Sequence, residues 1–180
     1  MELLINMDKI KAIIFENVVL TENSNEARLL FDKSTYGEVM RSGQVQLSFV
    51  EALYLVEKDK IEIVLNDSVV GFVDLLNKFK EKEDNVWVRF CTYKDLRDRG
   101  YLVKTALKFG ADFRVYDKGI KQGEDHSKWI VFAVSENKSL TWQEYAGKNR
   151  VAHSTKKRLM IAIVDDEGDV SYYENSWIRP

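Results

Sequence analysis

The chain has 180 residues, 45% of them hydrophobic and 31% charged, which is enough apolar material for one large folded domain or two small ones. A single cysteine, Cys91, excludes an intramolecular disulfide and a cysteine-rich metal cluster, and we expect it to be a small core residue. There is no apolar run of about 18 residues and no signal-peptide pattern at the start, so we expect a cytoplasmic protein without a membrane partner.

Charge is distributed unevenly along the chain. Residues 1–84 hold 10 Lys and Arg against 16 Asp and Glu, a balance of −6, whereas residues 85–180 hold 17 against 13, a balance of +4. A basic half suits a polyanionic partner such as nucleic acid, although an asymmetry of this size is also common in ordinary proteins.

The first half begins with a pattern typical of a small α/β unit. Residues 9–20 are rich in β-branched side chains and are interrupted by Glu16 and Asn17, which predicts two short strands joined by a turn. Apolar residues then recur at helical spacing over 48–58, and a further strand is predicted at 60–65.

In the segment that starts at Asp67, a second apolar stripe of helical period is formed by Val69, Phe72, Val73, Leu76 and Phe79. We expect Asp67 or Ser68 to be the N-cap of this helix. The stripe ends in residues 78–85, seven of which are charged or polar. We expect the boundary between two domains there, dividing the chain into 1–84 and 85–180.

The second half predicts a mixed sheet flanked by helices. A helix over 86–100 should end at Gly100, and Thr141 and Glu144 form the capping box of another helix. Strands are expected at 109–116, 127–134, 158–164 and 170–178, with the helix 141–153 between the second and the third. The last two strands should form an antiparallel hairpin, while the helix permits a parallel crossover. The fold class is therefore α/β (α+β), with a small N-terminal α/β domain followed by a C-terminal mixed-sheet domain.

Two residues in this second half could carry proton chemistry. Alternation along 109–116 places Tyr116 on one face of the strand and the apolar residues Phe113 and Val115 on the other face. His126 directly precedes a strand that is apolar on both faces, and a histidine in this position is a candidate general acid. Taken alone, the pattern favours an edge tyrosine and a solvated loop histidine over a catalytic role.

Adjacent lysines precede the strand 158–164. If alternation reaches back to them, Lys157 shares a face with Leu159, and Lys156 shares the other face with Met160. The periodicity does not decide between the two lysines, and cations at the start of a strand are often only solubilising.

Motifs for metal or cofactor chemistry are absent from the sequence. The two histidines, His126 and His153, have no cysteine or second histidine at ligand spacing, and there is no HExxH, no phosphate-binding glycine loop and no GxSxG motif. We therefore expect no metal and no cofactor.

Several spaced segments in one order nevertheless resemble a known family. They are YLVKTALKFGADFRVYDKG, HSKWIVFAV, NRVAHSTKKRLMIAIVD and the closing YYENSWIRP. Together, over about residues 86–180, they resemble the catalytic domain of archaeal tRNA-intron endonucleases, and the first half is similar to the small domain that precedes it in the single-unit, homotetrameric type.

The resemblance implies a catalytic triad of Tyr116, His126 and Lys157, with Lys156 as the alternative lysine. It implies cleavage of precursor tRNA at bulge-helix-bulge sites by attack of a ribose 2′-hydroxyl on its own phosphate, which leaves a 2′,3′-cyclic phosphate and a 5′-hydroxyl end. Such a reaction needs a base, an acid and a cation near the phosphoryl oxygens, and we assign these roles to Tyr116, His126 and Lys157.

The resemblance also implies two further sites. A bulged base would stack between Arg150 and Trp177, whose side chains both suit a base. The acidic hairpin tip would dock on a neighbouring subunit and join two dimers into a homotetramer; its residues are Asp165, Asp166, Glu167 and Asp169.

Two other functions remain open. One is a non-catalytic RNA-binding or scaffold subunit, against which the presence of all three triad residues argues. The other is a metal-dependent nuclease, which would need clustered carboxylates. The strand 109–116 offers only Asp112, and the strand 127–134 offers none.

Overall fold

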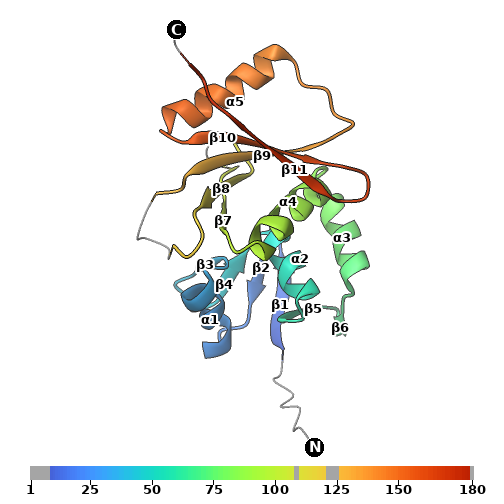
Figure 1. The fold of residues 1–180 in the computed structure, drawn as a ribbon. Coiled ribbons are helices and arrows are strands. Elements are labelled where there is room, and N and C mark those ends of the chain that lie inside the picture. Colours follow the sequence, from blue (N-terminus) through green and yellow to red (C-terminus); the bar gives the residue numbers. More distant parts are fainter. Residues whose placement is uncertain (1–8, 108–109, 121–125, 179–180) are drawn as a thin grey trace, which may run out of the picture. The chain divides into compact units, whose positions relative to one another are not determined.

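A computed structural model describes residues 9–107, 110–120 and 126–178 (Figure 1). The chain forms two compact units, Met1–Lys82 and Glu83–Pro180, and each is described by itself. That these units are independent domains divided after residue 84 stays a prediction. No helix in the described part of the chain is both long and apolar enough to cross a bilayer.

The first unit is a six-stranded sheet with helices. Its strands are ordered β3-β4-β2-β1-β5-β6, and β1 pairs antiparallel with β2 and parallel with β5. The predicted hairpin near the start is therefore confirmed. The elements are β1 Ile10–Phe15, β2 Val18–Thr21, α1 Asn25–Ser34, β3 Glu38–Val39, β4 Val45–Leu47, α2 Phe49–Glu57, β5 Ile61–Leu65, β6 Ser68–Val69 and α3 Phe72–Lys80.

Helix α2 forms the buried centre of this unit. It starts with a capping box in which the Ser48 side chain accepts from the Glu51 backbone and Glu51 accepts from the Ser48 backbone. The Glu51 carboxylate also accepts from Gly37 N at 2.9 Å, so this buried acid stabilises a turn as well as the start of the helix. Phe49 stacks on Phe79 of α3 with ring centroids 4.0 Å apart.

The predicted N-cap of α3 at Asp67 or Ser68 is wrong. Asn66 and Asp67 both have positive φ, and they form the two-residue turn of the hairpin β5–β6. Helix α3 begins only at Phe72, after Gly71, which provides no side-chain cap. Asn and Asp tolerate the left-handed backbone of such a turn, so local turn chemistry overrides the helical period of the apolar residues.

The second unit is a five-stranded mixed sheet between two helices. The strand order is β11-β10-β9-β8-β7; β9 and β10 are parallel and the other pairs are antiparallel. This confirms the predicted mixed sheet, its central strand and its final hairpin. The elements are α4 Val86–Asp98, β7 Leu102–Thr105, β8 Phe113–Tyr116, β9 Trp129–Ser135, α5 Trp142–Ser154, β10 Arg158–Val164 and β11 Val170–Asn175.

Helices α4 and α5 cover opposite faces of this sheet (Figure 1). On one face, Tyr93 of α4 packs against Phe113 of β8 with ring centroids 5.8 Å apart. On the other, Ala152 of α5 packs against Ile130 and Leu159. Both faces of β9 are thus buried, which explains its nearly continuous apolar sequence.

Candidate active site

Three strands of the second unit bring polar residues to one edge of the sheet. Val115 on β8 lies opposite Trp129 on β9, and Trp129 lies opposite Arg158 on β10. Because β8 runs antiparallel to β9 and β10 runs parallel to it, the end of β8 and the starts of β9 and β10 share this edge. Lys128 N donates to Val115 O at 2.8 Å, and Arg158 N donates to Lys128 O at 3.0 Å. These backbone hydrogen bonds continue the pairing of the three strands to Lys128, one residue before β9 begins.

Tyr116 is the last residue of β8 and directly follows Val115, which pairs with Trp129. Its side chain is buried, with 9% of its surface exposed. The preceding residue on the same face, Arg114, lies opposite Ile130, which packs against α5. Alternation therefore directs Tyr116 to the α5 face of the sheet.

His126 enters the same edge three residues before Trp129. It is exposed, and it immediately precedes the buried Ser127. The acidic neighbours noted in the sequence, Glu124 and Asp125, lie outside the described residues.

The two lysines before β10 have different environments. Lys156 has φ of 56°, is exposed, and donates its backbone N–H to His153 O in the turn that ends α5. Its left-handed backbone means that strand alternation does not extend back to it. Lys157 is half-buried and lines a small pocket of about 130 Å³ together with His153 and Trp177. Lys157 therefore lies at the same edge and beside α5.

Arg150 and Trp177 line one groove of about 610 Å³ between α5 and the segment that follows β11. His153, one helical turn beyond Arg150, lines this groove as well, and its ring meets that of Trp177 edge-on with centroids 4.8 Å apart. His153 also lines the Lys157 pocket. The sequence analysis did not predict His153 as a groove residue, although a residue three positions after Arg150 on a helix lies on the same side of it.

A second missed feature lies on the α4 face of the edge. Trp129 Nε1 donates to Glu174 Oε2 at 2.7 Å, and Arg158 Nη1 lies 3.0 Å from Glu174 Oε1. The hydrogen bond from Trp129 holds the pKa of Glu174 below its ordinary value, and the positive charge of Arg158 lowers this pKa further by a smaller amount. Glu174 thus ties together the starts of β9 and β10 and the end of β11.

The acidic tip between β10 and β11 has a defined shape. Asp165 Oδ1 accepts from the backbone N–H groups of Glu167, at 3.0 Å, and Asp169, at 2.8 Å. Asn137 donates to Asp166 at 2.9 Å. The side chains of Glu167 and Asp169 are exposed, and no side-chain hydrogen bond or ion pair of theirs is seen in the described part of the chain. Asp165 therefore shapes the turn, while these two carboxylates project from it.

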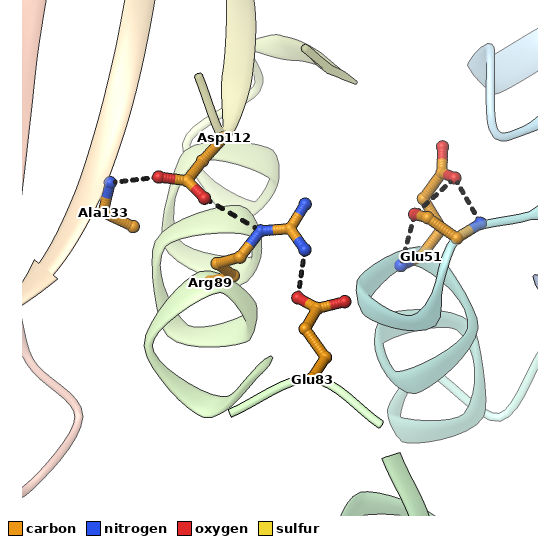
Figure 2. A network of polar contacts seen from close by, with 6 residues as sticks. Glu51, Glu83, Arg89, Asp112 and Ala133 are labelled. Carbon is orange, nitrogen blue, oxygen red and sulfur yellow. Dashed lines mark hydrogen bonds and ion pairs between the residues drawn. The ribbon is translucent and has the colours of Figure 1, made fainter. Parts of the chain in front are cut away.

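Asp112, the single acid of the strand considered for metal binding, has a structural role. It accepts from Ala133 N at 2.9 Å and lies 3.0 Å from Arg89 Nε, and Arg89 also pairs with Glu83 (Figure 2). Burial, the largest influence, raises the pKa of Asp112. Among the described residues, no group of three or more His, Cys, Asp or Glu is arranged to hold a metal ion.

Comparison with known proteins agrees with this architecture. Residues 86–172 match the tRNA intron endonuclease catalytic C-terminal domain, and residues 10–76 match the N-terminal domain of the same enzymes. The tRNA-splicing endonuclease of Methanothermobacter thermautotrophicus is 38% identical over 96% of this chain and 99% of its own. The tRNA-splicing endonuclease of Pyrococcus horikoshii is 41% identical over 83% of this chain and 85% of its own. That of Thermococcus onnurineus is 37% identical over 88% of this chain and 91% of its own.

A chain that is similar to these enzymes over nearly its whole length, and that has both of their domains, belongs to the tRNA intron endonuclease family. It is an endoribonuclease, and the resemblance noted in its sequence is confirmed.

Proposed function

We propose that this endoribonuclease excises introns from precursor tRNA by cutting at bulge-helix-bulge sites without a metal ion. Family membership supports intron excision. The observation that carries the catalytic proposal is the common sheet edge at which β8 ends and β9 and β10 begin, since Tyr116, His126 and Lys157 all flank it.

In the proposed reaction, the 2′-oxygen forms a bond to the adjacent phosphorus while the bond from phosphorus to the 5′-oxygen breaks. Tyr116 takes the proton of the 2′-hydroxyl, and His126 gives a proton to the departing 5′-oxygen. Lys157 stabilises the negative charge that gathers on the phosphoryl oxygens. The products are a 2′,3′-cyclic phosphate and a 5′-hydroxyl end, and no water or cofactor is consumed.

Substrate recognition rests on the groove lined by Arg150 and Trp177. A bulged nucleotide is unstacked and can be held between a guanidinium and an indole, whereas a base within a continuous helix cannot. The groove lies beside the Lys157 pocket, since His153 lines both. This adjacency supports a model in which a captured bulge base orients the neighbouring phosphate for cleavage.

The assembly we propose is a homotetramer made of two dimers. Glu167 and Asp169 supply exposed charge at the tip of a turn that Asp165 holds in shape. Such a projecting acidic turn suits a basic cleft on a second copy of the chain.

The proposal is tested by incubating the purified chain, in excess chelator, with an intron-containing precursor tRNA and with a copy whose bulges have been paired. We expect cleavage at both intron ends of the first RNA only. Cleavage that requires added magnesium would refute the mechanism, cleavage of both RNAs would refute bulge recognition, and binding without cleavage would indicate a scaffold subunit.

A further inference from the structure

The first residue of α5, Trp142, is unusually exposed. It has 86% of its surface accessible, more than any other large hydrophobic residue among those described. A tryptophan exposed to solvent in this way is a candidate for contact with a partner.

Trp142 lies in line with the groove that holds Arg150 and Trp177. Asn149 and His153, which line the groove, follow Trp142 by seven and eleven residues, or about two and three helical turns, so all three lie along one side of α5. The Trp142 ring meets that of Tyr145 edge-on at 6.1 Å, and Tyr145 also lines the groove. Aromatic side chains are therefore found from Trp142, through Tyr145, to the His153 and Trp177 pair in the groove.

We propose that Trp142 is a second base-stacking position, which extends RNA binding from the groove along α5 to a single-stranded segment of the precursor tRNA. This inference rests on the proposed function, because it takes the groove to bind RNA. From Trp142 to His153 the helix rises about 16 Å, at about 1.5 Å per residue. A strand stacked at about 3.4 Å per nucleotide covers that length with about five nucleotides.

The charges along this path suit a phosphate backbone. Arg150 is exposed at the groove, and Lys138, in the loop before α5, is close enough to the helix to influence Glu144 and Lys148 electrostatically. The nearby acid, Glu144, is held in the capping box by the Thr141 backbone and hydroxyl. Cations at both ends of an aromatic row are typical of surfaces that bind single-stranded nucleic acid.

A protein partner fits this surface less well. A stable interface buries about 800 Å² on each partner around an apolar centre. Trp142 is instead followed by the exposed polar residues Gln143 and Glu144. A pair of aromatic rings with polar neighbours suits stacked bases better than the apolar surface of a second chain.

The test uses the full chain and two bulge-helix-bulge RNAs with 2′-deoxy nucleotides at both cleavage positions, which prevents cutting. One RNA carries a five-nucleotide oligouridylate extension next to a bulge and the other does not. We expect the extension to improve the dissociation constant of the wild type about tenfold, an advantage that Trp142→Ala loses and Trp142→Phe largely retains. The control, Val73→Ala, removes an exposed apolar side chain of the first unit and should keep the advantage.

Three outcomes would overturn the inference: no advantage in the wild type, an advantage that persists in Trp142→Ala, or a change in oligomeric state caused by that substitution. The last would indicate that a second copy of the chain occupies this surface. Failure of the proposed function is recognised separately, because the wild type would then not cleave the all-ribose RNA without the extension.

Discussion

Arg158 of β10 lies directly opposite Trp129 of β9, and this register brings Lys157 to the edge of the sheet where β9 begins. Lys156, one residue earlier, belongs instead to the left-handed turn that ends α5. A neighbouring pair of lysines that is ambiguous in the sequence thus has two distinct environments in the fold.

Lys157→Ala should lower kcat for precursor tRNA by about 10²–10³-fold, because it removes the cation that stabilises the phosphoryl oxygens. Lys156→Ala is the matched control and should change kcat by less than about threefold, as expected for an exposed side chain away from the pocket. Steady-state cleavage rates at saturating precursor tRNA give kcat for both variants. The reverse order of effects would transfer the catalytic role to Lys156.

Tyr116→Phe should lower the single-turnover rate by about 10²–10⁴-fold with little change in melting temperature, because the buried ring is kept and only the proposed base is lost. Tyr36→Phe is the control, since Tyr36 in the first unit is buried to a similar extent, with 7% exposed. A Tyr116→Phe rate and pH-rate profile close to those of the wild type would contradict the assignment of the base.

The double variant Glu167→Gln/Asp169→Asn should convert the proposed tetramer into dimers without unfolding the chain, because Asp165 still holds the turn. Light scattering coupled to size-exclusion chromatography gives the mass. Glu81→Gln/Asp84→Asn, which removes the same charge elsewhere, should leave the tetramer intact. Tetramers that persist in the first variant would contradict docking through the acidic tip.

Glu174 predicts a pH dependence of stability. Its pKa in the folded chain lies below the ordinary value of about 4.3, so its contribution is present above that value and is lost as the pH falls through the folded-state pKa. Glu174→Gln should therefore lower Tm at pH 7, by less than about 5 °C because the carboxylate is partly exposed. The difference from the wild type should shrink below about pH 4. A difference that is independent of pH would contradict this origin.

Local sequence signals predicted much of the fold. The hairpins β1–β2 and β10–β11, the capping box of α5 and the doubly buried β9 each depend on residues close together in the chain, and each is confirmed. The predicted N-cap of α3 is wrong because the helical period of the apolar residues and the turn residues Asn66 and Asp67 give conflicting signals.

The polar network at the sheet edge could not be predicted in the same way. Trp129 and Glu174 are 45 residues apart and meet only because two strand pairings bring them together. The contact between His153 and Trp177 likewise depends on where the chain runs after β11. Single-residue periodicity carries no information on such pairings.

The central claim is that Tyr116, His126 and Lys157 promote attack by the 2′-hydroxyl next to the cleaved bond. The most direct measurement compares cleavage of an intron-containing precursor tRNA with that of a copy carrying a single 2′-deoxy nucleotide at one cleavage position, and identifies the ends of the products. We predict that the all-ribose RNA is cut at both positions to give 2′,3′-cyclic phosphate and 5′-hydroxyl ends, and that the substituted position stays intact. Cleavage at the 2′-deoxy position, or products with 5′-phosphate ends, would contradict the mechanism.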